Sequence, residues 1–483
     1  MPNKNLVDAL RAVVGGDGVF TEPAQLRTYE CDGLTNFRVL PGAVVLPRTA
    51  QQVQKVVRLC ASNGIPFVAR GAGTGLSGGA LPVKDGIVIG LARMNRILDV
   101  DFRNQRIVVE PGVINAHITQ RVASRGYFYA PDPSSQSVCT IGGNVAENSG
   151  GAHCLKYGFT VTHVLGLEVV LPSGEIVQMG SPVLDSPGYD LPGVFVGSEG
   201  TLGVATKITL RVFKRPESLQ TLLAAFDSIR AAAQTVSDII AARILPSAME
   251  IMDSLSIQAA QAAVHANYPI CKGLLLIELD GLEREVEVLA RRVQELCNQN
   301  GASSVVAAQS EKDRAAVWKG RKAAFAAVGR ISPNYIVQDG VVPRTALPEL
   351  LEQIERLSSE AGLRVANVFH AGDGNLHPLV LYDAAIVGQE ERALELSYRI
   401  LQLCVDQGGS ITGEHGVGKE KQAAMSYMFS EPDLNTMQLV RCAFDPQMLS
   451  NPDKVFPRPR LCAEKTGPYT PHPLEQAGIA ELF

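Results

Sequence analysis

The sequence predicts an α+β protein with two domains and a C-terminal segment, and three observations lead to this prediction. The 483 residues exceed what one ordinary hydrophobic core accommodates. Three glycine-rich segments interrupt predicted strands in the first half, and long amphipathic helices alternate with strands in the second half. We expect a first domain over residues 1–216, a second domain over 217–425, and a C-terminal segment over 426–483 that returns to the first domain.

Composition excludes several classes of protein. Hydrophobic residues make up 46% and charged residues 19%, and the net charge of −5 lacks the basic excess that nucleic-acid binding requires. Neither an 18-residue apolar run nor an N-terminal signal region is visible, so we expect a cytoplasmic protein that contacts the inner face of a membrane at most peripherally. Nine cysteines without a Cys-x-x-Cys pair argue against an iron–sulfur cluster and predict reduced thiols.

The first glycine-rich segment follows a predicted helix and strand. Thr49 and Gln52 predict the start of a helix that ends before Asn63-Gly64, and a strand is expected over Pro66–Arg70. The next residues, Arg70–Ala80, hold five glycines and match the bare Gly-x-Gly-x-x-Gly dinucleotide pattern. We reject a Rossmann unit, because the next predicted strand, Ile87–Leu91, leaves no room for a crossover helix. The segment is either a backbone cradle for a pyrophosphate or a tight structural turn.

Two more segments of this type strengthen the ligand interpretation. They are Thr140–Gly151 and Gly197–Gly203, and together with the first segment they suggest a long, flat ligand. Strands are predicted over Val164–Leu171, Glu175–Gln178 and Val204–Phe213. The polar run 214–218 then marks the domain boundary. Beyond it, strands near Leu219–Phe226, Leu274–Leu279 and Ser303–Ala307 alternate with helices around residues 286–296, 347–357 and 392–405.

Two histidines flank an Asp-Gly dipeptide in the second half. Asp373-Gly374 predicts a two-residue type I′ hairpin, which places His370 directly opposite His377. Opposed residues share a sheet face, so both imidazoles could reach one ion, with Glu414 as third ligand and one position open. This set suits zinc best and also iron or manganese. The alternative is a polar hairpin with two surface histidines.

At this point the motifs resemble a known family. The segments 68–80, 131–151 and 197–204 resemble the FAD-binding domain of the vanillyl-alcohol oxidase and p-cresol methylhydroxylase flavoproteins. Residues 367–378 and 413–418 resemble the D-2-hydroxyacid dehydrogenase branch of that family, and 318–325 with 328–333 are most similar to its glycolate oxidase flavin subunits. The likeness covers about residues 20 to 465. It implies a two-subdomain FAD-binding domain of the vanillyl-alcohol oxidase type and an α+β cap domain with a mainly antiparallel sheet.

The resemblance also implies roles for individual residues. FAD is expected to bind non-covalently, because the first glycine segment lacks the histidine that covalent members carry. His370, His377 and Glu414 would hold the divalent metal, His415 would be the base, and the substrate would contact Arg321, Lys322, Asn375 and His415. Arg321 is expected to bind the substrate carboxylate, and Lys322 is the alternative residue for this role. The residues expected at FAD are Arg70, Gly71, Ala72, Gly73, Thr74, Gly75, Leu76, Ser77, Gly78, Pro131, Asp132, Ser135, Gly142, Gly143, Asn144, Asn148, Gly151, Glu199, Gly203, Val204 and Asn451.

One departure from the family concerns the C-terminal segment 444–454, where relatives usually carry glycine at the positions of Met448 and Asp453. It weakens detailed predictions for the flavin contact there.

The implied activity is oxidation of a small D-2-hydroxy acid, glycolate or D-lactate, by hydride transfer to flavin. Three alternatives stay open: a D-2-hydroxyglutarate-type dehydrogenase, a catalytically silent flavin subunit, and a flavin-dependent transferase. The resemblance also implies a second flavin-domain subunit and an iron–sulfur subunit as partners, with electrons leaving to them, to a quinone or to another acceptor.

Overall fold

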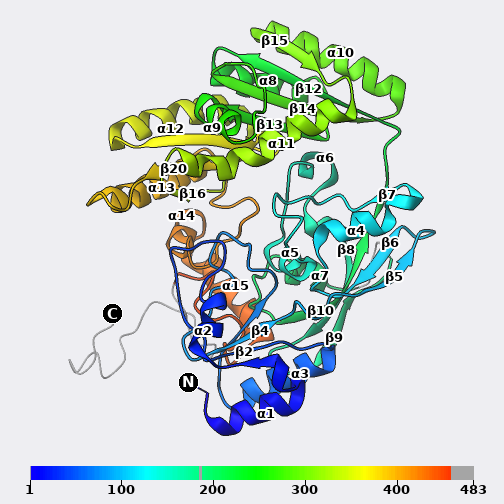
Figure 1. Ribbon diagram of the computed structural model, residues 1–483, viewed down its shortest axis with the longest axis vertical. Coiled ribbons are helices and arrows are strands. Elements are labelled where there is room, and N and C mark those ends of the chain that lie inside the picture. The colour runs from blue at the N-terminus through cyan, green and yellow to red at the C-terminus, as the bar shows by residue number, and fades with distance from the viewer. Residues whose placement is uncertain (1, 184–187, 458–483) are drawn as a thin grey trace.

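The fold class is confirmed by the computed structural model, which describes residues 2–183 and 188–457. The chain forms two bodies, shown below and above in Figure 1, and the segment that carries α14 and α15 descends from the second body to the first. Sequence-distant segments therefore meet where the two bodies face each other.

The first body begins with a four-stranded sheet of order β1-β2-β4-β3, in which β2, β4 and β3 run parallel. The Thr49 hydroxyl accepts a hydrogen bond from Gln52 N at 3.2 Å and caps α3, as predicted. Buried side chains of α1 and α3 share one core with the sheet. The elements are α1 (Lys4–Val14), β1 (Val19–Phe20), α2 (Pro23–Leu26), β2 (Ala43–Val45), α3 (Ala50–Ser62), β3 (Phe67–Arg70) and β4 (Ile87–Gly90).

The connection between β3 and β4 confirms that this is no Rossmann unit. The two strands are parallel neighbours, and the segment between them, residues 71–86, contains no helix. The glycine-rich segment is therefore a loop that leaves the end of a buried strand, which suits direct approach of its backbone to a ligand.

A second, antiparallel sheet of order β5-β6-β10-β8-β9 completes the first body. The predicted strands at 164–171 and 175–178 are present, and the predicted strand at 204–213 is divided into β10 and β11. The elements are β5 (Ile97–Asp101), β6 (Arg106–Val109), α4 (Asn115–Val122), β7 (Tyr127–Phe128), α5 (Ile141–Glu147), α6 (Cys154–Tyr157), β8 (Val164–Val170), β9 (Ile176–Gly180), α7 (Leu191–Phe195), β10 (Val204–Arg211) and β11 (Phe213–Lys214).

The second body is a nine-stranded antiparallel sheet with helices on both faces (Figure 1). Alternate residues of β12 enter different cores: Leu222 packs with α8, α10, α12 and α13, whereas Ala225 packs with α9 and α11. The strands are β12 (Ser218–Phe226), β13 (Ala248–Asp253), β14 (Gly273–Gly281), β15 (Ala302–Ala307), β16 (Asn334–Val337), β17 (Gly340–Val341), β18 (Arg364–His370), β19 (Asn375–Leu376) and β20 (Pro378–Tyr382). The helices are α8 (Ile229–Ala241), α9 (Ser254–Val264), α10 (Glu283–Gln299), α11 (Glu311–Ala327), α12 (Leu347–Ala361) and α13 (Gln389–Asp406).

After α14 (Met425–Met428) and α15 (Glu431–Phe444), the chain returns to the first sheet. Phe67 N donates to Leu449 O and Asn451 N donates to Phe67 O, both at 2.8 Å, so residues 449–451 lie alongside β3. The end of the described chain thus becomes part of the wall behind the first glycine segment.

Seven cysteines among the described residues are free, as expected. Cys442 is disulfide-bonded, so the expectation of reduced thiols is wrong at this position. Cys462 lies outside the described residues. Among the described residues, none of the helices combines the length and the apolar composition needed to span a bilayer.

Two residues of the C-terminal segment have a backbone conformation that favours glycine. Met448 and Asp453 have φ of 53° and 60°, in the left-handed region. A side chain in this region costs about 1–2 kcal/mol, whereas glycine adopts it without that penalty.

We therefore expect Met448→Gly to raise the free energy of unfolding by roughly 0.5–1 kcal/mol, because relief of the left-handed strain exceeds the added entropy of the unfolded chain. Gln447→Gly is the matched control, since Gln447 is exposed and its φ is not positive. That change should lower the free energy of unfolding by about 0.5–1 kcal/mol. Urea unfolding of FAD-loaded protein measures both, and equal destabilisation by the two changes would contradict this explanation.

Candidate active site

A pocket lies between the two bodies, and all three glycine-rich segments line it. The second body contributes residues from α11 and from the loops after β19 and α13. These residues are Arg321, Lys322, Phe325, Ala326, His377, Glu414 and His415. The glycine segments and the histidine cluster, which are far apart in the sequence, therefore face one cavity.

Most of the residues predicted to contact the cofactor line this pocket. They are Arg70, Gly71, Ala72, Gly73, Thr74, Gly75, Leu76, Ser135, Gly142, Gly143, Asn144, Glu199, Gly203 and Val204. The predicted residues that do not line it are Ser77, Gly78, Pro131, Asp132, Asn148, Gly151 and Asn451.

Several of these outer residues hold the pocket wall together. Asn451 Nδ2 donates to Gly79 O at 2.8 Å and to Glu199 O at 2.6 Å, which joins the C-terminal segment to two glycine segments. Asn148, at φ 52°, accepts a hydrogen bond from Val161 N through its side chain. Asn451 and Asn148 thus stabilise the pocket wall through hydrogen bonds although they do not line the pocket themselves.

Asp132 takes part in a link between the two bodies. Its Oδ2 lies 2.9 Å from His153 Nδ1, and His153 Nε2 lies 3.1 Å from Glu278 Oε1 on β14. Burial opposes a charge on the ring, but Asp132 and Glu278 raise the pKa of His153 to about 10. The imidazolium therefore connects one carboxylate from each body at neutral pH.

The glycine segments pack closely against neighbouring protein groups, which is possible only because these positions lack side chains. A Cβ on Gly73 would lie 2.1 Å from Arg70 Nη2, and a Cβ on Gly142 would lie 2.6 Å from Pro111 Cβ. The Arg70 guanidinium is buried beneath the first segment, 5.7 Å from the Tyr29 ring centroid. Exposed backbone N–H groups above a buried cation suit the pyrophosphate of a dinucleotide.

Sequence reasoning missed some pocket residues. Pro111, Thr140, Glu147 and Phe195 also line the cavity. The buried Thr140 hydroxyl has no hydrogen-bond partner among the described residues, as expected for a group that meets a ligand. Thr140 is the first residue of the second glycine-rich segment and lies two residues before the predicted Gly142, which was the available signal.

The predicted hairpin register is wrong, although the histidines still converge. His370 pairs with Asn375 rather than with His377, and a four-residue turn, residues 371–374, replaces the two-residue turn. Only Gly374 in this turn has a positive φ, 73°. The reason is tertiary: β19 pairs with β17, and Gly374 packs so closely on Val342 that a Cβ would lie 2.0 Å from its carbonyl oxygen.

His370, His377 and Glu414 lie within mutual reach of one ion. The Nε2 atoms of His370 and His377 are each 3.3 Å from Glu414 Oε1, and the ring centroids are 5.2 Å apart. The buried Nε2 of His377 makes no hydrogen bond. Two imidazoles and one carboxylate with an unsatisfied nitrogen fit a divalent cation with an open position.

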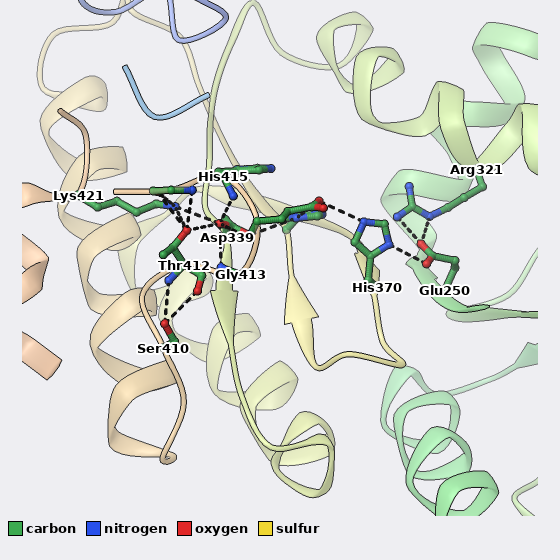
Figure 2. Close-up of polar contacts among 12 residues, drawn as sticks. Glu250, Arg321, Asp339, His370, Ser410, Thr412, Gly413, His415 and Lys421 are labelled. Atoms are coloured by element: carbon green, nitrogen blue, oxygen red, sulfur yellow. Dashed lines mark hydrogen bonds and ion pairs between the residues drawn. The ribbon is translucent and has the colours of Figure 1, made fainter. Parts of the chain in front are cut away.

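Glu250 orients His370 and was not predicted. Its Oε1 lies 2.7 Å from His370 Nδ1, and its Oε2 accepts from Arg321 Nε at 2.7 Å (Figure 2). A carboxylate on the second ring nitrogen is the usual support for a metal-binding histidine. The signal was a glutamate within the apolar strand β13, whose first five residues are buried. The predicted clamp Arg321 is thus already paired with a buried carboxylate.

Asp339, also unpredicted, holds the loop that carries Glu414 and His415. Its Oδ2 accepts from Thr412 Oγ1 at 2.6 Å, Gly413 N at 3.0 Å and His415 N at 2.9 Å (Figure 2). Asp339, His377 and His415 form a second group close enough for an ion. Because these donors and the nearby Lys421 ammonium occupy the carboxylate, the first group is the better cation site.

His415 stacks on His377, with ring centroids 5.0 Å apart and 3° between the planes. Burial lowers the pKa of His415 to about 4, so its ring is neutral at neutral pH and able to accept a proton. Asn375 is buried beside Gly413 and does not line the pocket. Lys322 is an exposed residue that lines it.

We expect Gly73→Ala to weaken FAD binding at least 10-fold, because the new Cβ would displace the Arg70 guanidinium and strain a backbone at φ +71°. Gly64→Ala is the control, since Gly64 has a similar φ of +61° but open space around it. Titration of apoprotein with FAD, followed by flavin fluorescence, measures both. An unchanged dissociation constant for Gly73→Ala would contradict the assignment of this segment.

Comparisons with known proteins agree with the geometry. Residues 41–180 match the FAD binding domain family, and residues 215–455 match the C-terminal domain of FAD linked oxidases. Glycolate oxidase subunit GlcD of Escherichia coli strain K12 is 50% identical over 457 residues, which cover 94% of this chain and 92% of that protein. The D-lactate dehydrogenase of Anaerostipes hadrus is 32% identical over 86% of this chain and 89% of its own. The solved structure of p-cresol methylhydroxylase, 19% identical, superposes with a TM-score of 0.79 over 93% of this chain and 96% of its own. The resemblance read from the motifs is confirmed, and the chain belongs to the FAD-linked oxidases.

Proposed function

We propose that this protein is an FAD- and divalent-metal-dependent dehydrogenase that oxidises a small D-2-hydroxy acid, either glycolate to glyoxylate or D-lactate to pyruvate. The observation that carries the proposal is the single pocket that joins the glycine segments to His377, Glu414 and His415. Similarity to a glycolate oxidase subunit and to a D-lactate dehydrogenase supports the same substrate class.

Oxidation of a 2-hydroxy acid removes a proton from the hydroxyl group and a hydride from the α-carbon. When bound, FAD accepts the hydride. Its binding is non-covalent in this proposal, because residues 70–80 contain no histidine or cysteine. The glycine segments and Arg70 would hold its pyrophosphate.

His370, His377 and Glu414 would hold the divalent ion, with zinc preferred and iron or manganese acceptable. The ion would supply Lewis acidity that lowers the pKa of the substrate hydroxyl. His415 would take the hydroxyl proton, since its ring is neutral, faces the pocket and is fixed by stacking on His377. Glu250 and Asp339 would keep the ligands and the base in position.

The substrate carboxylate needs a cation, and we propose Lys322 for the main contact. The guanidinium of Arg321 already donates to Glu250, which balances its charge. Lys322 is one turn removed from Trp318, with Nζ 5.9 Å from that ring centroid, and has no carboxylate partner among the described ion pairs. Arg321 would then act indirectly: it would hold Glu250 in position beside His370 and form part of the pocket wall.

The size of the substrate distinguishes glycolate from D-lactate only weakly. One methyl group distinguishes D-lactate from glycolate and is worth about 1–3 kcal/mol in a pocket. A dicarboxylate such as D-2-hydroxyglutarate needs a second unpaired cation, and Arg70, Arg321 and Lys322 are the basic lysine and arginine residues that line the described pocket. Arg70 lies beneath the cofactor segment and Arg321 is paired, so a monocarboxylate fits better.

Electrons must leave the reduced flavin, and the cysteine spacing offers no iron–sulfur cluster. We therefore propose transfer to a partner protein or to a quinone. The E. coli relative is a subunit by name, which supports an assembly with other chains. A second flavin-domain subunit and an iron–sulfur subunit are the proposed partners.

Anaerobic mixing tests the activity. Glycolate or D-lactate should bleach the flavin absorbance of the metal-loaded protein, and D-2-hydroxyglutarate should do so at least 10-fold more slowly. His415→Ala should retain FAD and lose about 100-fold or more in the bleaching rate, because the proton acceptor is missing. Bleaching at the wild-type rate by this variant would refute the role of His415, and absence of bleaching by both monocarboxylates would refute the proposed activity.

Lys322→Ala should raise KM at least 10-fold with a smaller effect on kcat, because the lost ion pair acts on the bound substrate in both ground and transition states. Lys319→Ala is the control, since Lys319 lies exposed on the same helix outside the pocket. Steady-state assays with a dye acceptor give both constants. A larger rise in KM for Arg321→Lys than for Lys322→Ala would transfer the carboxylate contact to Arg321.

A further inference from the structure

The loop that carries Glu414 and His415 is held from two sides, and we call residues 412–418 the ligand turn. On the side of the second body, Asp339 accepts hydrogen bonds from the N–H groups of Gly413, Glu414 and His415. Gly416 N donates to Thr412 Oγ1 at 3.0 Å. These contacts fix the first half of the ligand turn to the body that also provides the histidines.

The second half of the ligand turn is held by the FAD-binding body. Glu199 Oε1 accepts from Val417 N at 2.7 Å, and Glu199 Oε2 accepts from Gly418 N at 2.6 Å. The Ser77 carbonyl, within the first glycine segment, accepts from Lys419 N at 2.8 Å and Glu420 N at 3.0 Å. The residue that completes the proposed metal site is thus anchored to the same elements that surround the cofactor pocket.

Glu199 has little freedom to move separately from that pocket. It is only 6% exposed and lines the cavity. Its own N–H donates to Ala146 O at 2.8 Å, and its carbonyl accepts from Asn451 Nδ2 at 2.6 Å, while its backbone is at φ 53°. A displacement of the second glycine segment or of the C-terminal segment would therefore move the Glu199 carboxylate.

Close packing transmits such a displacement to the ligand turn. A Cβ on Gly416 would lie 2.5 Å from Glu147 Oε2 and 2.9 Å from Glu199 Oε1, and a Cβ on Gly418 would lie 2.2 Å from Ser77 O. The backbone of the ligand turn is thus in direct contact with the pocket wall. It cannot keep its position if the wall changes shape.

We propose that Glu199 is a positioning residue that couples the cofactor pocket to the ligand turn, so that FAD and the divalent ion bind with positive cooperativity. The inference rests on the proposed metal site. A cofactor that orders the glycine segments stabilises the position of Glu199 and with it Glu414, and linkage requires that the ion strengthen FAD binding by the same factor. Glu199 acts through backbone N–H groups of the ligand turn and needs no contact with the ion.

Amide hydrogen exchange tests the anchor itself in FAD-loaded, metal-free protein. Glu199→Gln replaces one accepting oxygen by an amide nitrogen, so at least one of the amides of Val417 and Gly418 should exchange at least 10-fold faster while those of Gly413 and His415 stay protected by Asp339. Glu175→Gln, an exposed glutamate of the same body, should change none of them. Unchanged exchange at residues 417 and 418 in Glu199→Gln would overturn the anchor.

Metal titration tests the coupling. The FAD-loaded wild type should bind Zn²⁺ about 10-fold more tightly than the full-length apoprotein, and in Glu199→Gln the two affinities should differ less than 3-fold. Equal Zn²⁺ affinities of the loaded and apo wild type would overturn the coupling and leave the metal site standing. Absence of Zn²⁺ and Mn²⁺ binding by the loaded wild type would overturn the metal site and the coupling together. The hydrogen-exchange experiment would still test the hydrogen bonds between Glu199 and the ligand turn.

Discussion

The buried carboxylate of Asp339 is the contact on which the candidate chemistry depends. It accepts hydrogen bonds from the N–H groups of three successive residues, Gly413 to His415, and the Asp339 side chain is fully buried. A buried N–H group without a partner costs about 1–3 kcal/mol, so these hydrogen bonds define one backbone path. That path directs Glu414 toward His370 and His377 and presents His415 to the pocket. Without it, the ligand set would be three residues on unrelated elements.

The contact made by Asp339 matters for function because the chain is divided into two bodies. The first body offers glycine segments on which a flat dinucleotide can lie, and the second offers imidazoles and carboxylates from its antiparallel sheet and from the loop after α13. Neither contains a complete site. The ligand turn and the segment 449–451 cross between them, so the cavity exists only where both bodies meet (Figure 1). In the proposed function, the redox cofactor and the ion would thereby share one cavity although the elements that bind them are far apart in sequence.

Local signals predicted much of this arrangement. The glycine segments, the absence of a crossover helix and the main strands follow from residue type and spacing, and His377, Glu414 and His415 line the same pocket as these segments. The hairpin register could not be predicted, because β19 pairs with β17 as well as with β18, and tertiary packing decides this pairing. Glu250 and Asp339 were missed for a related reason. They lie 120 and 76 positions from His370 and His415, and no local pattern connects residues at such separations.

The proposed mechanism requires one ion between His370, His377 and Glu414, facing the flavin. Anomalous X-ray scattering at the zinc edge, from crystals of the FAD-loaded protein grown with Zn²⁺, locates the ion directly. We expect one strong peak about 2.0–2.2 Å from both histidine Nε2 atoms and a Glu414 oxygen. A peak between Asp339, His377 and His415, or no peak near either group, would contradict it.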